Sequence, residues 1–168
     1  MGSEETTTEW SWRLLRTGTR GRYEMVERRL VVEYVVKKFP DRIWAKMWKR
    51  LGPTPRILEK MYPTVPKSVL RVYLPYCDAV VVTKDRIYII EVKVHNIHSG
   101  ISQLQQYVMI APHDPEIQRF LPRPIVGRFV TWRYDPTIEA LCRANGFEYD
   151  IYFPEWLKPH LRRYGYVV

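Results

Sequence analysis

The stretch Tyr88–His95, with the sequence YIIEVKVH, places two opposite charges inside a run of aliphatic residues. Side chains alternate across a β-strand, so Glu91 and Lys93 lie on the same face of any strand that includes them. The opposite face is aliphatic and holds Ile90, Val92 and Val94. We therefore expect a strand over Arg86–His95 that packs one face in the core and carries a charged pair on the other.

The residues before this strand predict a three-strand meander. Asp78–Thr83 is rich in valine, as buried strands are, and Lys84–Asp85 has the polar character of a tight hairpin turn. Val69–Leu74 is expected to be the first strand of the three. In such a hairpin, Asp78 lies close to Glu91 at one end of the sheet. Two neighbouring carboxylates repel each other, and a divalent cation between them relieves that repulsion.

Helices are expected before the meander. Tyr23–Phe39 contains good helix formers and ends before Pro40. At about 100° per residue, one side of this helix is charged and should face solvent: Arg29, Glu33 and Lys37. The other side should face the protein: Glu24, Glu27, Val31 and Val35. A second helix is predicted over Arg42–Leu51, where Trp44 and Trp48 lie one turn apart. The proline-marked segment 52–68 is expected to hold one more short helix.

After the meander, helical and strand patterns alternate. The expected elements are a helix that Ser99 caps and that runs to about Ile110, a strand (Ile125–Trp132), a helix (Pro136–Ala144), a strand (Phe147–Phe153) and a last helix (Glu155–Tyr164). This order predicts an α/β domain in which helices flank a central mixed β-sheet.

The charged residues of the meander resemble a known signature. Asp78, followed after a short hairpin by Glu91-Val92-Lys93, resembles the motif of the PD-(D/E)xK nuclease superfamily. In the next helix, Gln103 and Tyr107 resemble the QxxxY motif of the RecB-like branch of that superfamily. The resemblance covers roughly residues 23–132 and implies a restriction-endonuclease-like core of the order αβββαβ.

The first helix adds a further carboxylate to the resemblance. Glu27, in the sequence VERRL, resembles the ERxL pattern of archaeal junction-resolving nucleases, and Glu24, one turn earlier on the same side, is the alternative. The resemblance implies a metal-dependent deoxyribonuclease that leaves a 5′-phosphate. Mg²⁺ or Mn²⁺ would be held by Asp78 and Glu91, with Glu27 contributing directly or through water.

Three further residues have roles in this hypothesis. Lys93 would orient the attacking water or stabilise charge in the transition state. Gln103 and Tyr107, at i and i+4 on one helix face, would position a phosphate or support the site.

Charge and length also bear on function. The chain has 168 residues and a formal net charge of +9, which favours a polyanionic partner such as single-stranded, duplex or branched DNA. We expect one domain over residues 23–168, preceded by a flexible basic arm over residues 1–22, and homodimers are common among similar nucleases. The expected contacts to nucleic acid are Arg16, Arg20, Arg22, Lys46 and Lys49.

Several classes of protein are disfavoured by the sequence. No apolar run approaches the roughly 20 residues needed to cross a bilayer, and the first residues lack the pattern of a secretory signal, so an intracellular, cytoplasmic protein is expected. Two cysteines, Cys77 and Cys142, cannot supply a four-cysteine cluster and are expected to be buried. Few amides and 13 prolines favour a heat-adapted source, archaeal or viral.

Structural alternatives remain open for each candidate residue. Glu91 and Lys93 could form a surface pair on a half-exposed strand, and Glu27 could pair with Arg28 or Lys38. Gln103 and Tyr107 could form a polar helical rim. At the level of function, the alternatives are a non-catalytic nucleic-acid-binding protein that keeps the nuclease fold, and an assembly protein that binds another protein through exposed aromatic residues. RNA is not excluded as a substrate.

Overall fold

The computed structural model describes residues 22–168, with the backbone alone at residues 22–24. The helices are α2 (Arg22–Lys38), α3 (Arg56–Met61), α4 (Lys67–Leu70), α5 (Ser99–Ile110), α6 (Pro136–Ala144) and α7 (Lys158–Arg163). The strands are β1 (Trp44–Arg50), β2 (Tyr76–Val82), β3 (Ile87–Lys93), β4 (Ile125–Thr131) and β5 (Glu148–Ile151). Short 3₁₀ turns cover Arg71–Tyr73, Ala111–His113, Gln118–Phe120 and Glu155–Leu157.

The strands form one mixed sheet in the order β1-β2-β3-β4-β5. The first three strands are antiparallel neighbours, whereas β3, β4 and β5 run parallel. The crossover from β3 to β4 passes through α5, and that from β4 to β5 passes through α6, as parallel pairing requires. The expected α/β fold, a central mixed sheet flanked by helices, is therefore confirmed.

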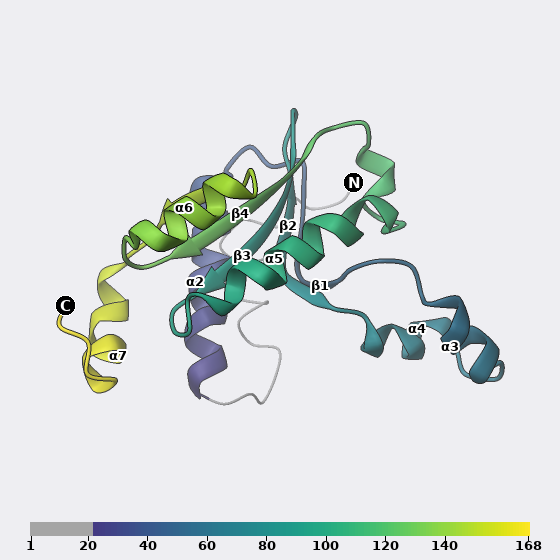
Figure 1. Ribbon diagram of the computed structural model, residues 1–168, viewed down its shortest axis with the longest axis horizontal. Helices are drawn as coiled ribbons and strands as arrows, with labels where there is room; N and C mark the ends of the chain where they lie inside the picture. The colour runs from purple at the N-terminus through teal and green to yellow at the C-terminus, as the bar shows by residue number, and fades with distance from the viewer. Residues whose placement is uncertain (1–21) are drawn as a thin grey trace, which may run out of the picture.

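Helices cover both faces of the sheet (Figure 1). On one face, α2 and α7 pack through residues such as Leu30 and Leu161 against Ile90, Val92 and Val94. On the other, α5 and α6 pack through residues such as Leu104 and Ile138 against Ile87 and Ile89. Because β3 lies between two apolar layers, any polar side chain on it is enclosed by protein.

The prediction of a helix over Arg42–Leu51 is wrong, because this segment is strand β1. Its residues pair with β2 from Trp44 opposite Val82 to Arg50 opposite Tyr76. The sequence misleads because residues four apart lie on one side of a helix and also on one side of a strand, so the tryptophan spacing fits both. Pairing with a strongly apolar strand decides between them.

The prediction of a strand over Val69–Leu74 is also wrong. These residues form the end of α4 and a 3₁₀ turn, and Pro75 follows directly. Leu70 and Leu74, four residues apart, are buried, whereas Val69 and Val72 are more than half exposed. The apolar residues therefore follow the helical period.

We call residues 51–75, which connect β1 to β2, the arm. It contains α3 and α4 and reaches away from the sheet (Figure 1). Every described side chain of α3 is exposed or half-buried. The arm thus has little core of its own and presents its side chains outward.

The solvent-facing side assigned to the first helix needs one correction. Arg29 and Lys37 are exposed, but the carboxylate of Glu33 is covered by the chain after β5. The hydroxyl of Tyr152 and the indole N–H of Trp156 donate hydrogen bonds to it at 2.7 and 2.6 Å. Glu33 therefore anchors the C-terminal segment to α2.

Two expectations concern the chain beyond the sheet. The flexible basic N-terminal arm predicted over residues 1–22, a different segment from the arm at residues 51–75, lies outside the described residues, except for the backbone of Arg22. Among the helices that the structure describes, none is both long and apolar enough to cross a membrane.

Candidate active site

Strands β2 and β3 separate at the level of Asp78 and Glu91. Their pairing runs from Val82 opposite Ile87 to Ala79 opposite Ile90 and stops there. Beyond this point the backbone N–H of Val92 donates to Oδ2 of Asp78 at 2.8 Å, in place of a main-chain carbonyl. The Asp78 carboxylate thus takes the place of a strand carbonyl as acceptor for β3, and this hydrogen bond fixes its position.

The carboxylate of Glu27 accepts a hydrogen bond from the same chain segment two residues after Val92. The N–H of Val94 donates to Oε1 of Glu27 at 3.1 Å. This contact brings α2 to the end of β3. Of the two candidates on that helix, the structure places Glu27 at the site, and the side chain of Glu24 lies outside the described residues. The alternative pairing with Lys38 does not occur, because the Lys38 ammonium lies 3.5 Å from Asp150.

Strand β1 is interrupted at the same level. Its pairing with β2 skips Trp48, which would lie opposite Asp78, and Trp48 has a φ of 49°. That left-handed conformation costs a non-glycine residue about 1 kcal/mol. The Arg28 guanidinium lies 4.2 Å from the centre of the Trp48 ring. The pairing of β2 with β1 and with β3 is therefore interrupted at Asp78, where its carboxylate reaches the cleft.

Glu91 and Lys93 form an enclosed pair. The side chain of Glu91 is 3% exposed and that of Lys93 is 18% exposed, and their Oε1 and Nζ atoms are 2.9 Å apart. The alternative of a surface pair on a half-exposed strand is therefore wrong. A buried pair of this kind is stabilising only where further polar groups complete it.

The charges at this site are unbalanced. Burial raises the pKa of Glu91, and the negative charge of Asp78 raises it further, to about 8. Burial also raises the pKa of Asp78, to about 6, although the Val92 N–H and Lys93 act against the increase. Burial lowers the pKa of Lys93, but the Glu91 and Asp78 charges outweigh that effect and raise it overall. The nearby cations Lys93 and Arg28 thus do not bring the two carboxyl pKa values back to their ordinary range.

Helix α5 closes over this pair at very short range. A Cβ on Gly100 would lie 2.3 Å from the ring of Phe129 and 2.9 Å from Cγ of Lys93. Only glycine lets the first turn of α5 approach so closely. The glycine therefore fixes how the following turns of the helix, and their polar residues, lie over β3.

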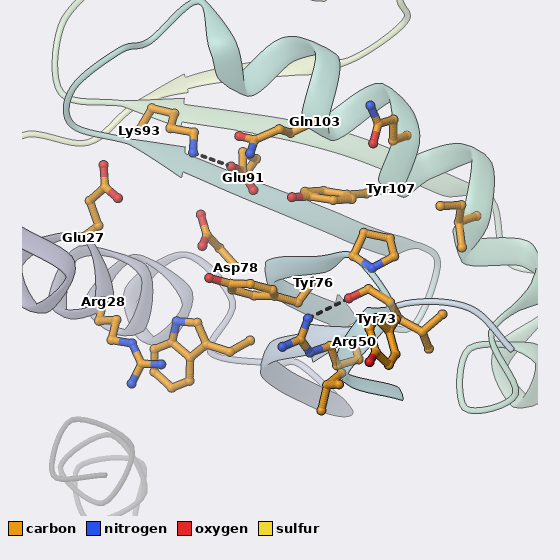
Figure 2. Close-up of a pocket in the computed structure, with 16 residues that line it drawn as sticks. Glu27, Arg28, Arg50, Tyr73, Tyr76, Asp78, Glu91, Lys93, Gln103 and Tyr107 are labelled. Atoms are coloured by element: carbon orange, nitrogen blue, oxygen red, sulfur yellow. Dashed lines mark hydrogen bonds and ion pairs between the residues drawn. The ribbon is translucent and has the colours of Figure 1, made fainter. Parts of the chain in front are cut away.

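Gln103 and Tyr107 project from α5 toward Glu91 (Figure 2). Tyr107 is buried, and burial together with the Glu91 and Asp78 charges raises the pKa of its hydroxyl, which stays protonated as a donor. Oε1 of Gln103 is buried and lacks a hydrogen-bond partner among the described residues. A buried acceptor without a partner is costly, which points to a group that binds there.

These residues share one cleft of about 770 Å³. Figure 2 shows Glu27, Asp78 and Glu91 pointing into it from α2, β2 and β3, with α5 opposite. The cleft is also lined by residues to which sequence reasoning gave no role: Arg28, Trp48, Arg50, Tyr73 and Tyr76. Trp48, Arg50 and Tyr73 were missed because their segments were predicted as the wrong elements, whereas Arg28 and Tyr76 carry no local signal for a role in the cleft.

The lysines expected to bind nucleic acid lie elsewhere. Lys49 is 1% exposed, and its ammonium contacts Asp114 at 2.9 Å and Glu116 at 2.7 Å, so its assignment as a phosphate contact is wrong. Lys46 is half exposed and bonds to Glu116 at 2.8 Å. The side chains of Arg16, Arg20 and Arg22 lie outside the described residues.

The donor set fits a hard divalent cation. Mg²⁺ is commonly held by one or two carboxylates together with water and substrate phosphates, and Asp78 and Glu91 supply such a pair. Within the described part of the chain, no three His, Cys, Asp or Glu side chains already stand at metal-ligand spacing.

Comparison with known proteins adds no assignment. No family model matches this sequence, and no curated protein matches it.

Proposed function

We propose that this protein is a metal-dependent deoxyribonuclease that acts in the cytoplasm. The observation that carries the proposal is the buried Glu91 beside the half-buried Asp78, with Lys93 2.9 Å from Glu91, at the floor of an open cleft. Two neighbouring carboxylates with raised pKa values destabilise a folded chain unless a ligand compensates their charge. The formal net charge of +9 is consistent with a polyanionic substrate.

The carboxylates would hold the cation, and their positions are set by the fold. Val92 N–H fixes Oδ2 of Asp78, and Oδ1 is the oxygen expected to face the ligand. Glu27, fixed by Val94 N–H, would contribute through water. Bound there, Mg²⁺ or Mn²⁺ would polarise the phosphate and lower the pKa of a nearby water.

The other polar groups would act on the phosphate and the attacking water. Lys93 remains protonated and would donate to a phosphoryl oxygen as negative charge develops on it. Tyr107 would donate through its hydroxyl, and the free Oε1 of Gln103 would accept from the attacking water. Water adds to phosphorus and the bond to the 3′ oxygen breaks, which leaves a 5′-phosphate and a 3′-hydroxyl.

The direct test is incubation with end-labelled single-stranded, duplex and branched DNA in Mg²⁺ or Mn²⁺, followed by gel analysis. The proposal predicts cleavage that EDTA abolishes and that Asp78→Ala and Glu91→Ala reduce to the level of a protein-free control. Glu155→Ala, at a surface carboxylate that is 85% exposed, serves as the matched control and should cleave like the parent. Cleavage that survives both site substitutions would refute the proposal.

A second candidate function is non-catalytic binding of nucleic acid on the same fold. The cations Arg28 and Arg50 beside the cleft favour it, because they would bind a phosphate backbone with or without chemistry. This candidate predicts salt-sensitive DNA binding without cleavage under every metal condition. An RNA substrate in the same assay distinguishes deoxyribonuclease from ribonuclease activity.

A further inference from the structure

The end of the arm and the start of β2 form one wall of the cleft and carry exposed aromatic rings. Tyr73 of the arm is 67% exposed, Tyr76 of β2 is 41% exposed, and both line the cleft, Tyr76 next to Asp78 and Tyr73 next to Arg50 (Figure 2). Neither ring is needed by the core, since both lie outside the two buried apolar clusters. Exposed tyrosines beside a cleft are typical of surfaces that bind flat, partly apolar groups.

Arginines are interleaved with these rings. The Arg50 guanidinium lies 4.8 Å from the centre of the Tyr76 ring, and its Nη1 donates to the carbonyl of Leu74 at 2.7 Å. Nη2 of Arg71 donates to the carbonyl of Arg50 at 3.2 Å. Hydrogen bonds to carbonyls hold both guanidiniums in place but do not cancel their charge. Arg71 also lies 3.8 Å from Asp114, which offsets part of it.

A second, smaller cleft of about 390 Å³ continues the first. The two share Trp48 and Arg50, and the second also includes Arg71 and the ion pair of Lys46 with Glu116. A chain leaving the carboxylates along this route would pass the ring of Tyr76 and the guanidiniums of Arg50 and Arg71. Rings beside cations match the two parts of a nucleic-acid strand, its bases and its phosphates.

From this arrangement we infer that the site takes an unpaired strand, whose bases stack on Tyr73 and Tyr76 and whose phosphates follow Arg50 toward Arg71. The faces of the bases are accessible in a single strand but are hidden by stacking in a duplex, so a wall of exposed rings selects the former. The inference rests on the proposed function, because it names the substrate of that site.

Binding measured without divalent metal tests this inference separately from cleavage. Fluorescence anisotropy in EDTA would compare a labelled oligothymidine with a hairpin duplex of the same length at one salt concentration. We expect the single strand to bind at least about 10-fold more tightly. Tyr73→Ala should weaken its binding by about 5- to 50-fold, since stacking on one ring contributes a change of this size.

Two control variants make the result specific. Tyr73→Phe keeps the ring and should bind within about 2-fold of the parent, as stacking does not need the hydroxyl. Tyr134→Ala removes a tyrosine that is 61% exposed but lies outside both clefts and should leave affinity unchanged. Equal affinity for strand and duplex, or equal effects of Tyr73→Ala and Tyr134→Ala, would overturn the inference.

The remaining outcomes are also decisive. If the strand binds through Tyr73 but is never cut in Mg²⁺ or Mn²⁺, the inference stands and the proposed nuclease activity fails. If duplex is cut and Tyr73→Ala has no effect, the activity stands and the inference fails. If Tyr73→Ala changes the mass found by sedimentation but not the affinity for the strand, the arm binds a second copy of the chain, and the inference is overturned.

Discussion

This molecule encloses two lysine–carboxylate clusters, and they differ in how well their charges are balanced. Lys49 contacts Asp114 and Glu116, and the oxygens of Asp114 also accept from the N–H groups of Gly52, Glu116 and Ile117. Although burial acts in the opposite direction, hydrogen bonds from Lys46 and Lys49 lower the pKa of Glu116 to about 2. The folded state therefore favours the charged form of Glu116.

The cluster of Glu91, Lys93 and Asp78 shows the reverse. Both carboxyl pKa values are raised, and Oε1 of the neighbouring Gln103 lacks a partner among the described residues. The contrast teaches that enclosure of charge does not by itself indicate function. A satisfied cluster holds the fold together, whereas an unsatisfied one that opens on a cleft is the better candidate for a binding site.

The largest change in stability is expected at the satisfied cluster. Asp114→Asn leaves the buried Lys49 with one carboxylate and should lower the free energy of unfolding by about 3 kcal/mol. Chemical denaturation monitored by tryptophan fluorescence measures this loss. Glu155→Gln, at an exposed ion pair with Lys158, is the control and should change stability by less than about 0.5 kcal/mol. Similar values for the two variants would contradict the structural role given to Asp114.

A smaller loss is expected where α5 meets β3. Gly100→Ala forces a methyl group against Phe129 and Lys93 and should lower the free energy of unfolding by about 1 to 3 kcal/mol. Because the clash displaces Lys93, cleavage should fall as well. Ser102→Ala, at an exposed position of the same helix, should alter neither quantity. A stable, fully active Gly100→Ala protein would show that the close approach is not required.

At the unsatisfied cluster, removal of a charge should stabilise the protein. The pKa of Glu91 is raised from 4.5 to about 8, so the folded state holds a proton that the unfolded chain has released between these values. The stability contribution of Glu91 is therefore greatest below pH 4.5 and is lost as the pH rises through about 8. Glu91→Gln should raise the free energy of unfolding by about 1 kcal/mol or more at pH 8 without metal.

The pH dependence provides the control for this prediction. Parent and Glu91→Gln should be nearly equal in stability at pH 5 and should diverge toward pH 8, while the variant loses cleavage. Thermal unfolding across this range in EDTA measures the divergence. If Glu91→Gln were the less stable protein at pH 8, the cluster would be structural, like that of Lys49.

The smallest effect on stability is expected at Gln103. Gln103→Met removes an acceptor without a partner and keeps the side-chain length, so the free energy of unfolding should change by less than about 1 kcal/mol. Cleavage should nevertheless fall by about 10-fold if the amide positions water or phosphate. Unchanged cleavage would assign Gln103 to the rim of the helix, as the structural alternative holds.

Much of this architecture could be predicted where the apolar residues clearly follow either the strand period of two or the helical period of about 3.6 residues. The alternation in Tyr88–His95 defines β3 and its charged face, and α5 and α6 match the predicted bounds because clear stop signals end them. In contrast, β1 has charged and aromatic residues that suit a helix or a strand. Its structure is decided by pairing with β2, and the residues of β1 alone do not indicate that this pairing forms.

The candidate site was predictable in part for the same reason. Asp78, Glu91 and Lys93 follow from strand alternation and hairpin geometry. The role of Glu27 depends on the Val94 N–H, and that of Lys49 depends on Asp114, 65 residues away. Contacts between residues so distant in sequence follow from the folded topology and not from local pattern. Tyr73 was missed because Val69–Leu74 was predicted to be a strand, and Tyr76 was missed because it lay between two predicted strands.

The claim that Asp78 and Glu91 form a metal site can be tested most directly by anomalous diffraction from crystals soaked in Mn²⁺. The account predicts an anomalous peak within bonding distance of both carboxylates and its loss in Glu91→Gln crystals treated in the same way. A well-ordered cleft without such a peak, or a peak that persists in Glu91→Gln, would contradict it.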